Sequence, residues 1–285
     1  MKIGIICNHT KPQVKDLIPG MVEFLLSAGQ TPILEPDTAE SMDRPELGKQ
    51  QNDLLSESDA LVTLGGDGTI LHLARNIYPR KIPVMGVNLG KVGFLSEFTV
   101  DDVYPALEAL ISGKVKISKR SMLQVEVSST GSGRISYSSP ALNDVYITRR
   151  PSGRMAHVRV HCDGCLINSY RADGLLISTP TGSTAHAMSA GGPILLPETG
   201  CFVVVPICPF TLMNRPVIVD DKSLLSIIPG QIGQDLVVVV DGQIEQRLQP
   251  DEKVLVKLAP ETFMLATSPS KSVFDIMREK FSWGN

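Results

Sequence analysis

The segment ALVTLGGDGTILHLARN, residues 60–76, contains the pattern that decides the fold of this chain. Its first five residues are mostly apolar, which is typical of a strand buried on both faces. A turn with three glycines and one aspartate follows, and a helix is expected from about Thr69 to Tyr78. Backbone N–H groups converge in such a turn, and glycines let a phosphate approach closely. The segment therefore predicts a phosphate cradle formed by Gly65, Gly66, Gly68 and Thr69.

Asp67 places a carboxylate inside this cradle, where it would repel a bound anion. Its presence makes sense if the ligand also brings a hydroxyl or a divalent cation. A carboxylate can take the proton of an attacking hydroxyl, or help to hold Mg²⁺. A cradle with a carboxylate then describes a phosphoryl-transfer site. The alternative is a turn residue that bonds its own backbone, as aspartate often does, and this segment alone leaves both interpretations open.

The composition narrows the class of protein. The chain has 285 residues, of which 42% are hydrophobic and 20% charged, as expected of a globular protein with a sizeable core. A net charge of -3 implies no basic face for nucleic acid or a membrane surface. No apolar run approaches the roughly 20 residues of a membrane span, and five cysteines do not make a disulfide framework. We therefore expect a cytoplasmic protein with no nucleic-acid or membrane partner.

The texture of the sequence changes near residue 115. Before it, apolar segments at 2–7, 31–35, 60–64 and 82–87 alternate with helical patterns, which predicts crossover connections and a parallel sheet. Residues 1–114 are therefore expected to form an α/β domain with a parallel, Rossmann-like sheet, whose glycine turn makes it the candidate nucleotide-binding domain. Short β-rich segments follow, and alternation around Asp163-Gly164 predicts a two-residue hairpin. We expect a mostly antiparallel, β-rich domain over 115–270 and a closing helix over 271–285 that packs back on the first domain.

Several familiar signatures are missing. The sequence has neither the P-loop pattern nor the dinucleotide fingerprint G-x-G-x-x-G, and TGSTA lacks the last glycine of a nucleophile elbow. Cys162 and Cys165 form a C-x-x-C that is compatible with metal or redox work. No second pair stands at metal-ligand spacing, so two small side chains paired on a hairpin are the favoured interpretation.

Six ordered segments resemble one known family. LVTLGGDGTIL (61–71) resembles the glycine-aspartate motif of the NAD kinases, which phosphofructokinases and diacylglycerol and sphingosine kinases share more loosely. The later segments follow the order of the NAD kinase family and extend the resemblance over essentially the whole chain. They are ALNDVYITR (141–149), YRADGLLISTPTGSTAHAMSAGGPIL (170–195), PICPFTLMNRPVIV (206–219), VVVDGQ (238–243) and FDIMREKFSWGN (274–285).

The resemblance implies an activity and an architecture. NAD kinases transfer the γ-phosphoryl group of ATP, or in some members of polyphosphate, to the adenosine ribose 2′-hydroxyl of NAD, giving NADP. Their architecture is similar to the one expected here, an α/β N-terminal domain and a β-rich, NAD-binding C-terminal domain. Asp67 would be the general base, Mg²⁺ would neutralise charge on the phosphates, and a homodimer or homotetramer would form as in relatives.

The resemblance also implies a set of NAD-binding residues. Asn143 and Asp144 match the Asn-acid pair that holds adenosine, since an amide both donates and accepts at a base edge and a carboxylate accepts from a ribose hydroxyl. Arg154 and Arg171 match positions that contact the dinucleotide, and Asp173 matches one near the nicotinamide end. The full set is Asp67, Gly68, His72, Asn143, Asp144, Arg154, Arg171, Asp173, Thr184, Ala185, His186, Ser189 and Gln243. No side chain is assigned as a metal ligand.

Ordinary alternatives stand beside several of these assignments. Asn143 and Asp144 also fit a turn before a strand, and the two arginines also fit solvated strand positions. His72 is expected to face roughly the same way as Asp67, with a helix-surface histidine as the alternative.

The chain departs from the family at three positions. His186 stands where the family generally has Tyr, Phe210 where it often has His, and Asp144 where Glu is more usual. These changes bear on NAD affinity and donor preference, and they motivate the hypothesis that His186 makes NAD binding pH-dependent between about pH 5.5 and 7.5.

Two rival functions remain. One is a lipid kinase of the diacylglycerol or sphingosine type, against which stand the LND and TPTGSTA segments and the absence of an obvious lipid-entry segment. The other is a dinucleotide-binding regulatory protein that has lost catalysis, which the retained Asp67 opposes.

Overall fold

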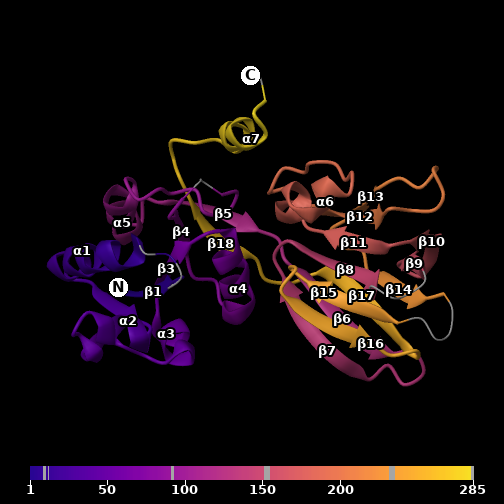
Figure 1. The fold of residues 1–285 in the computed structure, drawn as a ribbon, viewed down its shortest axis with the longest axis horizontal. Coiled ribbons are helices and arrows are strands. Elements are labelled where there is room, and N and C mark those ends of the chain that lie inside the picture. The colour runs from indigo at the N-terminus through magenta and orange to yellow at the C-terminus, as the bar shows by residue number, and fades with distance from the viewer. Residues whose placement is uncertain (9–10, 12, 91–92, 151–154, 231–234, 284–285) are drawn as a thin grey trace. The chain divides into compact units, whose positions relative to one another are not determined.

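The chain folds into two compact units (Figure 1). The computed structural model describes residues 1–8, 11, 13–90, 93–150, 155–230 and 235–283. The first unit comprises Met1–Lys119 and the C-terminal segment from Phe263, and the second comprises Arg120–Thr262. The expected class, a parallel α/β region with a β-rich region and a C-terminal helix, is confirmed.

A six-stranded sheet forms the centre of the first unit, in the order β2-β1-β3-β4-β18-β5. The pairs β1–β2, β1–β3, β3–β4 and β4–β18 are all parallel. Every residue of β3 is buried, as the apolar run at 60–64 predicts. The strands are β1 (Lys2–Cys7), β2 (Thr31–Leu34), β3 (Ala60–Gly65), β4 (Val84–Asn88), β5 (Lys116–Arg120) and β18 (Phe263–Thr267).

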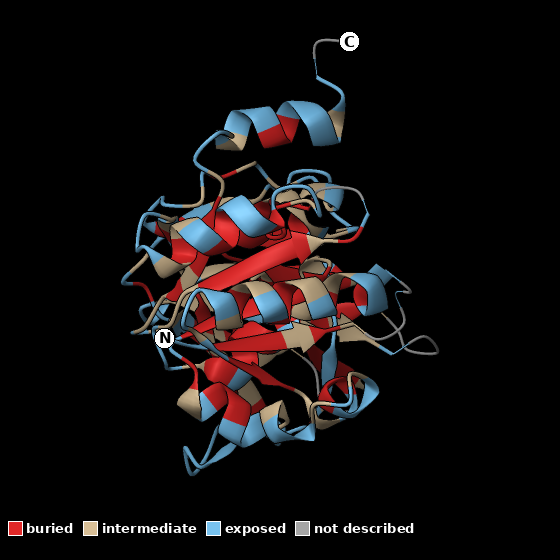
Figure 2. Cartoon of the chain, turned by 90° about the vertical axis from the view of Figure 1, so that its left-hand side faces the viewer, coloured by how far each residue is buried: buried red, intermediate tan, exposed pale blue. Residues whose placement is uncertain are grey.

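Helices accompany this sheet, with buried inner and exposed outer faces (Figure 2). Pro19 lies inside the first of them without ending it. The helix after β3 begins at Asp67, two residues before the predicted start, because Gly66 is its N-cap. The elements are α1 (Gln13–Ser27), α2 (Pro36–Ser41), the 3-10 turn η1 (Pro45–Leu47), α3 (Gln51–Glu57), α4 (Asp67–Ile77), α5 (Val103–Ile111) and α7 (Val273–Phe281).

The polar segment 44–57 is divided into η1 and α3. Between them, Gly48 forms a parallel bridge with Leu34, and the Lys49 N–H donates to the Leu34 carbonyl at 2.9 Å. This backbone pairing extends the end of β2, so the chain at 48–49 cannot be helical.

The two units divide at other positions than the predicted boundaries of 114 and 270. β5 and β18, both expected in the β-rich domain, belong to the parallel sheet of the first unit. Four of the five residues of β18 are buried, which is typical of a strand covered on both faces. Its pattern predicts a strand, but the choice of sheet rests on partners about 180 residues earlier in the chain.

The closing helix α7 belongs to the first unit. A capping box between Ser272 and Asp275 starts it, and Ile276 and Met277 are buried. The Phe281 ring lies 5.4 Å from the ring of Phe94, which follows β4.

The second unit consists mainly of two six-stranded sheets, with orders β10-β9-β14-β17-β6-β7 and β13-β12-β11-β8-β15-β16. One core of Val, Ile and Leu side chains with Tyr170 and Phe202 contains residues from both sheets. The β9–β10 hairpin turns on Asp163-Gly164, both with positive φ, which confirms the predicted two-residue turn.

The elements of this unit are β6 (Leu123–Ser129), β7 (Ile135–Ala141), β8 (Asp144–Arg149), β9 (Ala156–Cys162), β10 (Cys165–Ala172), β11 (Gly174–Ser178), η2 (Thr181–Thr184), α6 (His186–Ser189), β12 (Cys201–Ile207), β13 (Val217–Asp220), β14 (Leu225–Pro229), β15 (Leu236–Val240), β16 (Ile244–Leu248) and β17 (Glu252–Leu258). Across the described parts of both units, no helix has the length and apolar character needed to cross a bilayer.

Two isoleucines of one sheet test the core of the second unit. Ile227 in β14 is 1% exposed, whereas Ile135 in β7 is 51% exposed. We expect Ile227→Ala to lower the free energy of unfolding by about 2 to 5 kcal/mol, because it removes buried methyl groups and leaves a cavity. Ile135→Ala should cost less than about 1 kcal/mol. Urea unfolding followed by circular dichroism measures both, and equal losses would contradict this packing.

Candidate active site

The glycine turn after β3 forms the start of α4. β3 ends at Gly65, Gly66 is the N-cap, and Asp67 is the first helical residue. A side chain at position 65 would collide with the Thr69 hydroxyl, which explains the glycine there. The four predicted cradle residues thus lie in one tight turn at the carboxyl edge of a parallel sheet. Ligands of open α/β sheets bind at this edge, and helix N-termini favour anions.

The Asp67 carboxylate binds the backbone of the loop after β4. Its Oδ1 accepts from the N–H groups of Leu95 at 3.2 Å and Ser96 at 3.0 Å, and from the Ser96 hydroxyl at 2.8 Å. Its Oδ2 accepts from the Phe94 N–H at 2.9 Å. We call these four hydrogen bonds the Asp67 clamp. Because its donors lie 27 to 29 residues away, Asp67 is not the locally bonded turn residue of the alternative interpretation.

Two further contacts fix the loop of the Asp67 clamp. The Asn88 amide at the end of β4 donates to the Ser96 hydroxyl at 2.8 Å. Gly93 approaches Asp67 so closely that a Cβ at position 93 would collide with Oδ1. The sequence interpretation missed this loop, although NLGKVGFLSEF at 88–98 follows the strand next to β3 and its glycines were a usable signal.

In the second unit, Asn143 and Asp144 lie at the start of β8. Asn143 is half-buried and Asp144 is 4% exposed. Burial, followed by the nearby charge of Asp241, raises the pKa of Asp144 to about 7. The hydroxyl of Thr179 donates to the carbonyl of Leu142 at 2.7 Å, so the segment after β11 holds the backbone before Asp144.

The small-residue segment 181–189 lies beside Asn143. Gly182 packs against the Asn143 backbone so closely that a Cβ would collide with its carbonyl oxygen. The Ser183 hydroxyl donates to the Pro180 carbonyl at 2.6 Å and accepts from the Leu195 N–H at 2.9 Å. The predicted residues are half-buried or exposed: Thr184 ends η2, Ala185 connects it to α6, and His186 and Ser189 are the first and last residues of α6.

His186 lies with its ring edge-on to Tyr146, at 5.0 Å between ring centroids. Tyr146 is two residues after Asp144 in β8. Burial lowers the pKa of His186, so the imidazole gains a proton at more acidic pH than an exposed histidine.

Two other predicted residues, Asp173 and Arg171, have partners on neighbouring elements. Arg149 donates to the Asp173 carboxylate at 3.0 Å, so this acid is part of an ion pair. The Arg171 guanidinium lies 5.2 Å from the centre of the Phe210 ring. Gln243 is exposed in the turn between β15 and β16.

One predicted position among the described residues does not join these groups. His72 is exposed and lies 2.9 Å from the Asn76 amide on the same helix. Five residues along an α-helix turn a side chain by about 140°, so His72 and Asp67 leave the helix in different directions. Arg154 lies outside the described residues.

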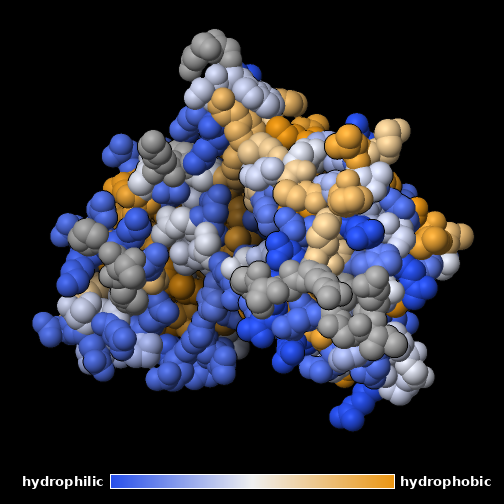
Figure 3. Space-filling model, turned by 45° about the vertical axis from the view of Figure 1, so that its right-hand side comes forward, coloured by the Kyte–Doolittle hydropathy of each residue, from blue (hydrophilic) through white to orange (hydrophobic). Residues whose placement is uncertain are grey.

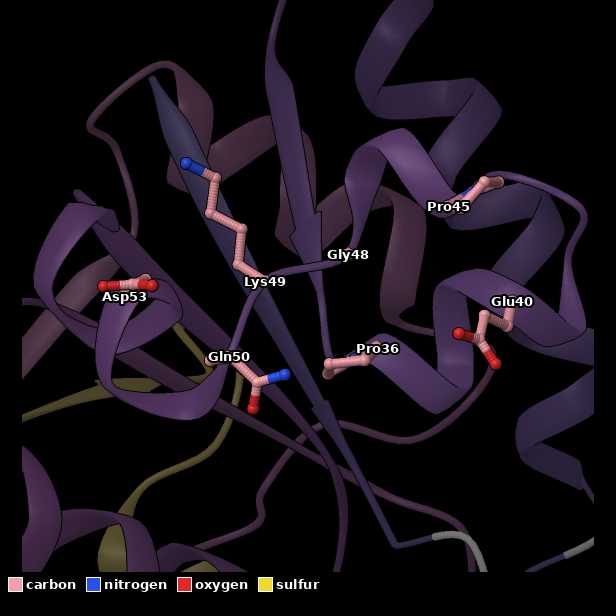
Figure 4. Close-up of a pocket in the computed structure, with 7 residues that line it drawn as sticks. All are labelled: Pro36, Glu40, Pro45, Gly48, Lys49, Gln50 and Asp53. Atoms are coloured by element: carbon pink, nitrogen blue, oxygen red, sulfur yellow. The ribbon is translucent and has the colours of Figure 1, made fainter.

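A separate pocket of about 340 Å³ lies in the first unit near the end of β2 (Figure 4). Lys49 in its lining is paired with Glu57 at 2.5 Å. None of the predicted site residues lines the pocket, whose lining is Pro36, Glu40, Pro45, Gly48, Lys49, Gln50 and Asp53.

Comparison with known families decides the assignment. The model of the ATP-NAD kinase N-terminal domain matches residues 3–115, and that of the ATP-NAD kinase C-terminal domain matches residues 142–268. The chain belongs to the ATP-NAD kinase family. The expected enzyme class, a kinase that phosphorylates NAD, is confirmed by this membership, and the lipid-kinase alternative loses its basis.

Individual relatives agree over the full length. The chain is 37% identical to the NAD kinase of Geotalea daltonii and 38% identical to that of Syntrophotalea carbinolica, each over 99% of both chains. Yeast NADH kinase complexed with NADH is a similar solved structure, with a TM-score of 0.87 at 28% identity over 99% of this chain and 87% of that one. An NAD kinase from Archaeoglobus fulgidus in complex with ATP shares the fold, with a TM-score of 0.77 at 24% identity over both full chains.

Gly93 and Gly90 test the Asp67 clamp within one loop. A methyl group at position 93 would collide with Asp67 Oδ1, whereas at position 90 the nearest atom is 3.7 Å away. We expect Gly93→Ala to lower the rate of NADP formation at least about ten-fold, because a displacement near 1 Å at a reacting group has effects of that size or larger. Gly90→Ala should stay near wild type. Equal rates for the two variants, both folded by circular dichroism, would contradict the importance of the clamp.

Proposed function

We propose that the protein transfers the γ-phosphoryl group of ATP to the 2′-hydroxyl of the adenosine ribose of NAD, with Asp67 as general base. The bond between the 2′-oxygen and phosphorus forms, the bond from phosphorus to the β,γ-bridging oxygen breaks, and ADP leaves. The hydroxyl proton passes to Asp67 and then to solvent. The products are NADP and ADP.

The geometry of Asp67 supports this role. Oδ1 carries three hydrogen bonds, whereas Oδ2 accepts one from the described residues. Oδ2 therefore keeps a lone pair for the hydroxyl proton, on a carboxylate that the loop 94–96 holds in place. Because phosphoryl transfer passes through a loose transition state, positioning contributes more than strong basicity.

Magnesium fits this site as an ion that arrives with ATP. Mg²⁺ usually keeps several waters and binds through one or two carboxylates plus substrate phosphates. Asp67 is the carboxylate in the turn that could contribute to holding such an ion. When bound, it neutralises charge on the phosphates, while Asp67 and the N-terminus of α4 orient the reacting groups.

Residues of the second unit bind NAD, the molecule that accepts the phosphoryl group. Asn143 and Asp144 hold the adenosine, the first by the base edge and the second by a ribose hydroxyl. Arg171, Asp173, the segment Thr184–Ser189 and Gln243 contact the rest of NAD. Arg154 and His72 belong to the set carried over from the family, but His72 leaves α4 in another direction than Asp67 and is the weaker member. ATP is the phosphoryl donor in this proposal, and polyphosphate is the alternative donor to be compared with it.

One assay tests the proposed reaction. Protein, Mg-ATP and NAD are incubated, and the product is detected with a dehydrogenase that accepts NADP and not NAD. Asp67→Asn should lower kcat by roughly 10² to 10⁴, the range for loss of a general base, while NAD binding measured by calorimetry persists. Ser96→Ala, which removes one clamp donor and leaves the carboxylate, should lose far less activity. NAD binding by wild type without NADP formation would instead support the regulatory alternative.

Self-association is part of the proposal. Phe210, Leu212 and Met213 in the loop before β13, and Ile218 within it, are 52% to 87% exposed, and Figure 3 shows apolar side chains gathered on the surface of the second unit. β13 is also an edge strand. Exposed apolar patches of this kind mark protein interfaces, so we assign this face to a homodimer or homotetramer. All five cysteines are free thiols, which accords with a cytoplasmic location.

Light scattering after size exclusion tests the association. Wild type should elute with two or four times the chain mass of 30.8 kDa. Ile218→Lys should shift the protein toward the monomer because it places a charge on the apolar face. Ile135→Lys, on the exposed edge strand β7, is the matched control. A monomeric wild type would refute the assignment.

A further inference from the structure

Asp241 binds the backbone of three consecutive residues at the start of β8. Its Oδ1 accepts from the N–H groups of Asn143 at 2.8 Å and Asp144 at 3.2 Å, and its Oδ2 accepts from the N–H of Leu142 at 3.1 Å. The Asp241 N–H donates in return to the Asp144 carbonyl at 2.9 Å. Asp241 is 6% exposed and has a left-handed backbone conformation, with φ of +49°. It lies in the Asp-Gly turn between β15 and β16.

The carbonyl groups of the same segment are held from the other side. The Thr179 hydroxyl donates to the Leu142 carbonyl at 2.7 Å, and the Thr179 N–H donates to the Asn143 carbonyl at 2.9 Å. Gly182 packs against the same peptide. The backbone of 142–144 is therefore fixed through both its N–H and its carbonyl groups.

The side chains of Asn143 and Asp144 differ in this respect from the backbone that carries them. Within the described part of the chain, neither the Asn143 amide nor the Asp144 carboxylate makes a side-chain hydrogen bond, although Asp144 is 4% exposed. A buried carboxylate without a partner is costly, and Asp241 adds a like charge beside it. An arrangement that satisfies the backbone and leaves the side chains open is that of a preorganised ligand site.

We propose that Asp241 is a positioning residue for NAD, which holds residues 142–144 so that Asn143 and Asp144 present open side chains to the adenosine. This rests on the proposed function, because it takes the adenosine of NAD as the ligand of Asn143 and Asp144. Asp241 acts through these two residues and touches neither phosphate nor donor.

The charge of Asp241 gives the proposal a pH signature. The Asp144 carboxyl, with a pKa of about 7, accepts a ribose hydroxyl best when ionised, so kcat/KM for NAD should rise with pH through that value. Removing the Asp241 charge lowers the pKa of Asp144, which moves this rise to more acidic pH. The other titratable groups nearby are Tyr146, whose pKa is raised, and His186, whose pKa is lowered, and Glu245 faces Tyr146.

Asp241→Asn and Asp163→Asn form a matched pair. Both aspartates precede glycine in a hairpin turn of the second unit with φ of +49°, and asparagine tolerates this conformation. The Asp163 carboxylate accepts from the Leu224 N–H at 2.9 Å, whereas residues 142–144 donate to Asp241. Asp163 is therefore a control for an aspartate in the same kind of turn that holds a different segment. In Asp241→Asn the amide NH₂ faces the Leu142 N–H, so the hydrogen bond from Leu142 to position 241 is lost. The negative charge at position 241 is removed as well.

We expect Asp241→Asn to raise KM for NAD about ten-fold near pH 8, to leave KM for ATP unchanged, and to move the pH rise to lower pH. Asp163→Asn should match wild type in all three. The same profiles in a His186→Phe background remove the imidazole as the source of the shift. A merely structural Asp241 would change both KM values together or neither, without moving the pH rise, and either result overturns the proposal.

Thr179→Val gives a second variant if Asp241→Asn fails to fold. It removes the hydroxyl bonds to the carbonyls and leaves the Asp241 charge, so KM for NAD should rise while the pH rise stays in place. An unchanged KM for NAD would count against the fixed backbone. Calorimetry with NAD tests the proposed reaction and the positioning role of Asp241 separately. Wild type that binds NAD without forming NADP refutes the proposed reaction. The Kd of Asp241→Asn for NAD still decides whether Asp241 positions the NAD-binding residues.

Discussion

The arrangement of the candidate active site depends on the hydrogen bonds from the loop 94–96 to Asp67. The N–H groups of these residues need acceptors after β4 ends, and a carboxylate satisfies several of them at once. The same bonds, together with the N-terminus of α4, stabilise the negative charge of Asp67. A carboxylate in a glycine turn is therefore compatible with a phosphate ligand nearby. Glycine is also required for the packing of the protein, because a side chain at position 93 would occupy the space of the Asp67 carboxylate.

The second unit repeats this physical device with Asp241. In both units an aspartate that follows a buried strand accepts consecutive backbone N–H groups of a distant segment. A carboxylate suits this task because its two oxygens accept several bonds without donating any. The result in each case is a rigid loop, which catalysis by positioning requires. In the second unit the device also costs electrostatic energy, since Asp241 lies beside the buried Asp144.

The sequence predicts features whose cause is local and misses those whose cause is remote. The buried run at 60–64, the glycine turn and the Asp163-Gly164 hairpin were all readable, because strand burial and turn chemistry act over a few residues. The place of β18 was not, because its parallel partner β4 lies about 180 residues earlier. The hydrogen bonds of Asp241 are not predictable from the local sequence for the same reason. VVVDGQ has the pattern of an ordinary hairpin, and only the fold brings the N–H groups of 142–144 to its carboxylate.

The two aromatic departures from the family lie in the second unit. The Arg171 guanidinium lies over the ring of Phe210, and the Phe210 N–H donates to the Arg171 carbonyl at 2.8 Å. Phe210 therefore restrains a cation at the place where a histidine would offer a polar group. His186 rests edge-on against Tyr146. Partial burial lowers the pKa of His186, and its ring offers a ligand less stacking area than a tyrosine would. Both residues belong to the second unit, whereas the Asp67 clamp lies wholly within the first, so the hydrogen bonds that hold Asp67 do not depend on either departure.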